Sequence, residues 1–329
     1  MSTTPAPTFG PGINLLTTST PNGIKVSVAL EELQLVGAIP GYNFTKISFQ
    51  ANDQKSDWFM KVNPNGVYFR APPRLHGPTG SLTSLLLYAG RIPALVDNRE
   101  GKKPINVWES ASILLYLSKT YDTKFAFHFE DEDEETEMIN WIMFLQGGVG
   151  PMQGQGKLWK FALVLAPTIT LISALPANHF NRYAPEKIQY GIDRYQNETR
   201  RLYGVYEQQL AGGKEYLVGP GKGKYSYADM CSFPWIRSHD WAGVSTEKFP
   251  NVEAWIQRNE ARPGVIAGLK IPEQDGLTLM KLDPELAAKT AKEGSAWVSC
   301  GGSEDWEAGA DVIMGVRQIM KGVANDAKK

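Results

Sequence analysis

Two adjacent side chains, Glu109 and Ser110, stand where a short apolar strand is predicted to turn into an apolar helix, within residues 106–117. The N-terminus of such a helix offers free backbone N–H groups and positive dipole charge to a carboxylate. Glu109 can pair with an ammonium group. A second predicted strand, over residues 91–97, is entered through an X-Pro bond. This unit predicts a site for a small zwitterionic ligand, although the same two residues can also act as a simple helix cap.

The residues around this unit alternate between strand and helix patterns. In chain order, we expect a strand, a buried helix after a Pro-Asn-Gly turn, a strand, a short helix, a strand, and finally the strand that turns into a helix. These elements correspond to residues 13–18, 24–35, 42–49, 55–61, 91–97 and 107–121. Strands that alternate with helices are typical of an α/β domain.

The pattern becomes helical throughout from an acidic cluster at residues 130–137, which we interpret as the solvated first turns of a helix. Amphipathic stretches follow at residues 188–210 and 252–262. Ser226 and Asp229 have the S/T-x-x-D spacing of a capping box at the start of a buried helix. The second half is therefore predicted to be all-α, and this cap is assigned a structural role.

Composition excludes several classes of protein. With 42% hydrophobic and 21% charged residues and a net charge of −1, the chain is expected to be globular, with neither nucleic acid nor membrane as a partner. The longest apolar run, residues 161–176, is too short to span a bilayer. The two cysteines have no metal-ligand spacing, and the first 12 residues, a flexible arm, carry no signal-peptide features. We therefore expect a cytoplasmic protein without a bound metal.

An α/β half with an Ile-Pro strand and a Glu-Ser helix start, followed by a helical half with an S-x-x-D cap, resembles the cytosolic glutathione transferases. The resemblance is stronger to the nitrogen-regulator-like, or nu-type, transferases of fungi and bacteria. The segments that carry it are TPNGIK at 20–25, NPNG at 63–66, RIPALVD at 91–97, WESASILLYL at 108–117, HFNRYAPEKI at 179–188, DRYQNETRRLYGV at 193–205 and SYADMCSFPW at 226–235. It implies a thioredoxin-like N-terminal domain over residues 13–123 and an all-α C-terminal domain over 130–272, with a helical extension over 273–329.

The resemblance also implies where glutathione binds. Pro93 matches the cis-proline of the family, and the backbone of Ile92 would then bond the cysteinyl part of glutathione. Glu109 and Ser110 match the pair that holds the γ-glutamyl end.

Asn22 matches the position nearest the glutathione sulfur, with Thr20 as a neighbour. An amide cannot remove the thiol proton, but it can donate a hydrogen bond to the sulfur, and the following helix N-terminus adds positive potential. Both effects favour the thiolate, which is the nucleophile. A turn-forming role beside Gly23 is the alternative, and it is compatible with the first.

The function expected from the resemblance is a glutathione transferase, with glutathione as substrate and an electrophile, a peroxide or a mixed disulfide as the second substrate. Arg194 is a further candidate for the cleft, unless it lies on a solvated helix face. A homodimer is expected. The alternative function is a non-catalytic glutathione-fold binding or regulatory protein.

Three stretches depart from the family pattern, at residues 67–90, 156–176 and 298–318. Their boundaries can be encoded by splice-site-like codons, so one hypothesis is that they are retained introns translated in frame. The alternative is that they are surface loops. The first stretch ends just before Arg91-Ile92-Pro93 and could therefore displace Ile92 and obstruct the glutathione site.

Overall fold

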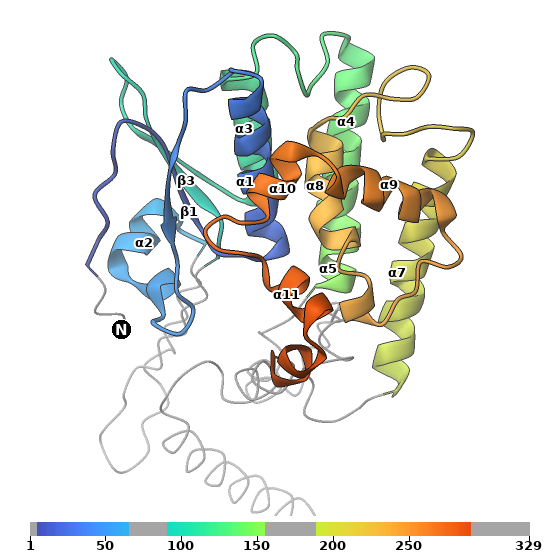
Figure 1. The fold of residues 1–329 in the computed structure, drawn as a ribbon. Helices are drawn as coiled ribbons and strands as arrows, with labels where there is room; N and C mark the ends of the chain where they lie inside the picture. Colours follow the sequence, from blue (N-terminus) through green and yellow to red (C-terminus); the bar gives the residue numbers. More distant parts are fainter. Residues whose placement is uncertain (1–4, 66–90, 155–188, 291–329) are drawn as a thin grey trace, which may run out of the picture.

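The computed structural model describes residues 5–65, 91–154 and 189–290 (Figure 1). The three departing stretches, at 67–90, 156–176 and 298–318, lie outside the described residues, as does most of the extension over 273–329. None of the helices in the described ranges combines the length and apolarity that a bilayer span requires.

A four-stranded sheet forms the centre of the first half, in the order β2-β1-β3-β4. Strand β1 (Gly12–Thr17) pairs in parallel with β2 (Asn43–Lys46), and it pairs antiparallel with β3 (Ala94–Asn98), which pairs antiparallel with β4 (Ile105–Trp108). The predicted element order and the α/β class are confirmed. Strand β2 is shorter than predicted because the chain turns after it, where the Ser48 N–H donates to Asp53 Oδ2 at 2.9 Å. Strand β3 begins only after Pro93, which has no N–H to donate.

Helices cover both faces of the sheet. The longer helices α1 (Pro21–Leu35) and α3 (Ser110–Thr120) share one large apolar core with the second half of the chain. A smaller core on the other face holds β-strand residues against α2 (Asp57–Val62), which follows η1 (Asp53–Lys55). Helix α1 is buried on nearly all sides, as expected for a helix between a sheet and a helical domain.

The second half is helical throughout its described ranges, which confirms the prediction. Figure 1 shows it packed beside α1 and α3, on the side away from the strands. Its elements are α4 (Glu132–Phe144), η2 (Leu145–Val149), α5 (Gly150–Gln153), α7 (Gln189–Gln209), α8 (Tyr227–Ile236), η4 (Asp240–Ala242), α9 (Pro250–Glu260), α10 (Pro263–Gly268) and α11 (Gly276–Leu282). The acidic cluster does form the first turns of a helix, α4.

The two halves meet where α1 packs against α8 and α10. Gly268 of α10 is needed there, because a Cβ on it would lie 2.7 Å from the backbone of Val28 in α1. The predicted capping box of α8 is present, and the Ser226 N–H donates to Asp229 Oδ2 at 3.0 Å. Asp229 also accepts from Trp255 Nε1 at 2.8 Å. The box therefore holds the buried start of the helix that backs α1.

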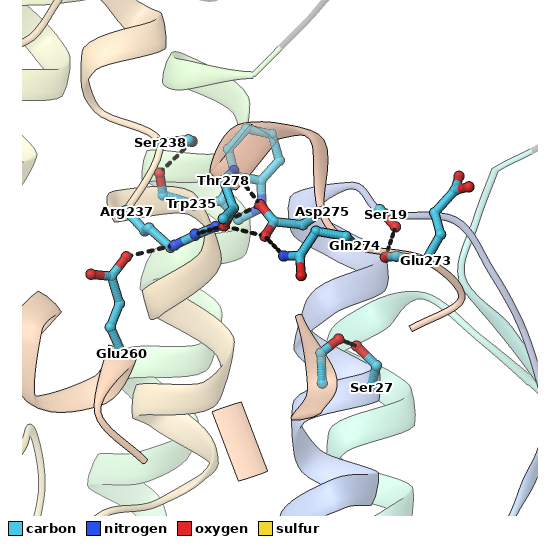
Figure 2. Close-up of polar contacts among 11 residues, drawn as sticks. Ser19, Ser27, Trp235, Arg237, Ser238, Glu260, Glu273, Gln274, Asp275 and Thr278 are labelled. Carbon is cyan, nitrogen blue, oxygen red and sulfur yellow. Dashed lines mark hydrogen bonds and ion pairs between the residues drawn. The ribbon is translucent and has the colours of Figure 1, made fainter. Parts of the chain in front are cut away.

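A C-terminal strap, defined as residues 269–282, follows α10 and makes polar contacts with both halves (Figure 2). The buried Arg237, which directly follows α8, donates from Nη1 to Asp275 Oδ1 in the strap at 2.8 Å. Two residues earlier in the strap, the backbone carbonyl of Glu273 accepts from Ser19 Oγ at 2.9 Å. The strap thus ties the end of α8 to the residues that lead into α1 (Figure 2).

Candidate active site

A pocket of about 290 Å³ opens where β3, α1 and α3 approach one another. Its lining combines five residues of the sequence prediction with three that were not assigned a role. The lining residues are Asn22, Asn63, Asn65, Arg91, Ile92, Pro93, Glu109 and Ser110. The structure therefore brings together residues that lie up to 88 positions apart in the chain.

Glu109 precedes α3 with a φ of 69°, in the left-handed region that residues other than glycine seldom adopt. Such a conformation costs on the order of 1–3 kcal/mol and is typical of functional sites. The Glu109 side chain is exposed, and its Oε1 accepts from Asn65 Nδ2 at 2.7 Å. Ser110, the first residue of α3, is buried. A carboxylate therefore faces the pocket beside a helix N-terminus and a hydroxyl.

The Ile92–Pro93 peptide bond is cis, as predicted. The backbone before it is held in place, since Arg91 O accepts from Asn63 Nδ2 at 2.7 Å. Asn63 also accepts from the Asn65 N–H at 2.9 Å, so one buried asparagine organises two sides of the pocket. The Asn-Pro-Asn-Gly run was noted in the sequence only as part of the resemblance. Its turn chemistry is the signal that could have assigned it this role.

Asn22 lies in the first turn of α1 and lines the pocket. Thr20 does not line it, but caps α1 by accepting from the Gly23 N–H at 3.2 Å. Gly23 is required for this tight start, because a Cβ there would lie 2.2 Å from Thr18 O. The cap therefore presents Asn22 together with a helix N-terminus, while Thr20 acts on the helix start.

The orientation of the Asn22 amide is determined by Trp235, at the end of α8. Trp235 Nε1 donates to Asn22 Oδ1 at 2.9 Å. Because an indole N–H is a donor only, the oxygen of the amide must face it. The Nδ2 group makes no hydrogen bond among the described residues, so its hydrogens are available to an acceptor in the pocket. Nothing in the sequence indicated this contact, which joins residues 213 positions apart.

Arg194 does not reach this pocket. It lies on α7 and lines a second pocket of about 470 Å³ with Met152, Tyr195, Asn197, Glu198 and Arg201. No group of three or more His, Cys, Asp or Glu side chains positioned to hold a metal occurs in the described ranges.

Two family models match the chain, glutathione S-transferase, N-terminal domain over residues 20–120 and glutathione S-transferase, C-terminal domain over residues 170–263. The disulfide-bond oxidoreductase YghU of Escherichia coli is 31% identical over 273 residues, which cover 80% of this chain and 76% of that protein. A solved glutathione transferase homologue from Lodderomyces elongisporus, with two GSH per subunit, is 30% identical. The match covers 80% of this chain and 100% of that chain, with a TM-score of 0.60.

This chain belongs to the glutathione transferase family. The transcriptional regulator URE2 of Saccharomyces cerevisiae is also similar, at 27% identity over 287 residues, 77% of this chain and 66% of that protein. The glutathione transferase fold predicted from the sequence, a thioredoxin-like domain followed by an all-α domain, is therefore confirmed, as is the resemblance to the nitrogen-regulator-like subgroup.

Proposed function

We propose that this glutathione transferase is an enzyme that binds glutathione in the pocket at Glu109 and Ser110 and uses its thiolate as a nucleophile. One observation carries the proposal. Asn22, the cis Ile92–Pro93 bond and the Glu109–Ser110 pair come from three separate elements and line one pocket.

The ligand groups can be assigned to the lining by charge. Glu109 suits the ammonium of the γ-glutamyl end, and Ser110 with the N-terminus of α3 suits its carboxylate. The backbone of Ile92 suits the cysteinyl part. Asn22 then lies near the sulfur, where its Nδ2 group and the N-terminus of α1 favour the thiolate over the thiol.

Among second substrates, we favour disulfides. The relative from Escherichia coli is called a disulfide-bond oxidoreductase, and the solved homologue carries two GSH per subunit. The thiolate of one glutathione would attack the glutathione sulfur of a mixed disulfide. The S–S bond breaks, glutathione disulfide forms, and the released thiolate takes a proton. Cys231 is fully buried and does not line the pocket, so we assign the nucleophile to the substrate.

Further parts of the proposal concern the whole protein. We propose a homodimer, a cytoplasmic location, a role in detoxification, and a division into domains at 13–123 and 130–272 with an extension over 273–329. Hydroperoxides and carbon electrophiles are further substrate classes. A non-catalytic regulator, like URE2, is the competing function.

The decisive experiment measures turnover of the full chain with glutathione and a mixed disulfide, a hydroperoxide or a chlorodinitrobenzene. Asn22→Ala should lower kcat by about 10-fold or more with little change in glutathione affinity, because the lost hydrogen bond is strongest to the thiolate. Glu109→Gln should instead weaken binding by about 10- to 100-fold. Binding without turnover of any substrate would favour the regulator. Absence of glutathione binding by calorimetry would refute both functions.

A further inference from the structure

Helix α1 carries three buried polar side chains, Lys25, Ser27 and Glu32, and two of them are fully accounted for by partners in the second half of the chain. Ser27 Oγ donates to Gly268 O at 2.8 Å, in the contact drawn in Figure 2. Glu32 receives two hydrogen bonds from Arg262, at 2.7 and 2.9 Å. These contacts attach α1 to α10, satisfy the Ser27 hydroxyl and pair the Glu32 carboxylate with a cation.

Lys25 is the third, and it is different. It is fully buried, and its Nζ donates to Gln146 Oε1 at 2.6 Å and to Ser110 Oγ at 3.3 Å. Both partners are neutral. Within the described part of the chain, no carboxylate lies within 4 Å of this ammonium.

The groups around Lys25 do not supply a full counter-charge. Burial lowers the pKa of Lys25, while Cys231 on α8 and Glu109 before α3 act to raise it. Burial in turn raises the pKa of the Cys231 thiol, which keeps that group neutral. Glu109 is exposed and already accepts a hydrogen bond from Asn65. From η2 the facing group is the amide of Gln146. An isolated buried ammonium is costly, so an anion that arrives beside it gains more than it would in water.

The position of Ser110 determines where such an anion would arrive. An ammonium has donors only, so Ser110 Oγ must be the acceptor in this contact. The hydroxyl hydrogen of Ser110 is then available to an acceptor in the pocket that Ser110 lines. Ser110 also begins α3, where backbone N–H groups and the helix dipole favour negative charge.

We propose that Lys25 is the buried counter-ion of the ligand carboxylate bound at Ser110, and that it acts through the Ser110 hydroxyl as a positioning residue. This inference rests on the proposed function, in which the pocket takes a γ-glutamyl ligand. It assigns part of the recognition of that ligand to a residue that never touches it. Lys25 therefore selects for the α-carboxylate and not for the amine or the thiol.

Calorimetry with two ligands tests the proposal. The first is S-methylglutathione, which has no titrating thiol. The second is γ-aminobutyryl-S-methylcysteinylglycine, which differs only by lacking the α-carboxylate. In the full chain, Lys25→Met should weaken binding of S-methylglutathione by about 10- to 100-fold. It should change binding of the second ligand by less than about 2-fold, and Lys25→Arg should retain more affinity for the first ligand than Lys25→Met does.

An equal loss for both ligands would show that Lys25 only holds the helices together, and it would overturn the inference. No loss for either ligand would overturn it too. Binding of neither ligand by the unmodified chain would refute the proposed function instead.

A second measurement does not depend on the stability of Lys25→Met. In the chain with isotopically labelled lysine, the Lys25 signal is assigned with Lys25→Arg and titrated by NMR. S-methylglutathione should raise the pKa of Lys25, because its carboxylate favours the charged form, and the decarboxylated ligand should not. The same pKa with both ligands contradicts the proposal.

Discussion

Replacing Asp275 by alanine is expected to lower the free energy of unfolding by about 3 to 4 kcal/mol, because it breaks a buried ion pair and removes a helix cap. Asp275 is 1% exposed and Arg237 is 5% exposed. Asp275 Oδ1 accepts from Arg237 Nη1 at 2.8 Å and from the Thr278 N–H at 3.1 Å, which caps α11.

The magnitude follows from what remains after the substitution. Removing one partner of a buried pair costs about 3 to 5 kcal/mol when the other charge is left alone. Arg237 would keep Glu260, whose Oε1 lies 2.7 Å from Nε but whose side chain is 34% exposed. That residual partner places the loss at the lower end of the range. The lost cap adds about 1 kcal/mol.

Urea unfolding of the full chain measures this loss. Glu273→Ala is the matched control, because it removes the pair with Lys46 in the same strap, where both side chains are about half exposed. It should cost less than about 1 kcal/mol. Hydrogen exchange should also become faster in α11 with Asp275→Ala and remain unchanged with the control. A loss for Asp275→Ala no larger than that of the control would refute the reasoning.

The same carboxylate gives the loss a pH dependence. Burial alone would raise the pKa of Asp275, but its hydrogen bonds with Arg237 and Thr278 and the charge of Arg237 outweigh burial and hold the pKa below its ordinary value. A depressed pKa contributes stability above the unfolded-state value and loses it as the pH falls through the folded-state value. The stability difference between the unmodified chain and Asp275→Ala should therefore be constant from neutral pH to about pH 4 and become smaller below it.

Two further predictions concern the pocket. Trp235→Phe should raise the thiol pKa of bound glutathione by about 0.5 to 1, because Asn22 loses the donor that orients its amide. Thiolate absorbance followed against pH measures this, and an unchanged titration would contradict it. Deletion of residues 67–90 should leave a folded chain that binds glutathione at least as tightly, because Asn63 Nδ2 and Arg91 O lie only 2.7 Å apart across the ends of that segment. Circular dichroism and calorimetry test this, and an unfolded or non-binding product would refute it.

The sequence predicted the elements that local patterns specify. A Pro-Asn-Gly turn before an apolar helix, the Ile92-Pro93 strand and the Glu109-Ser110 helix start all carry a mechanism at short range, and each was found close to its predicted place. Strand β2 spans Asn43–Lys46 and is shorter than the predicted 42–49. The Asp53 carboxylate accepts from the Ser48 N–H and stabilises a turn there, which the pattern of apolar residues does not indicate.

The contacts that orient the site could not be predicted in this way, because they are long-range. Trp235 read only as an apolar residue of a buried helix, and its hydrogen bond to Asn22 depends on how α8 packs against α1. The family resemblance makes Arg194 a candidate for the cleft, yet α7 places it in a different pocket. Lys25 stands inside an apolar run, which is a signal of a buried charge, yet it enters the sequence prediction only within the TPNGIK segment, with no role of its own.

The pocket is lined by residues of the α/β half, yet it depends on the all-α half through helix α1. The helix is buried on nearly all sides, so its polar side chains must find partners on other elements. Asn22 and Lys25 lie three residues apart on this helix, and Asn22 lines the pocket while Lys25 donates to Ser110. Helix α8 supplies a partner to each of them. Trp235 donates to Asn22, and Cys231 interacts with Lys25. Trp235 and Arg237 stand two residues apart at the end of α8, and the strap holds Arg237, so we expect a change in the strap to alter the position of Trp235 and the orientation of the Asn22 amide. The strap is therefore expected to influence both thiolate formation and the stability of the fold. Trp235→Phe separates these two effects, because it removes the hydrogen bond to Asn22 and leaves the Arg237–Asp275 pair in place.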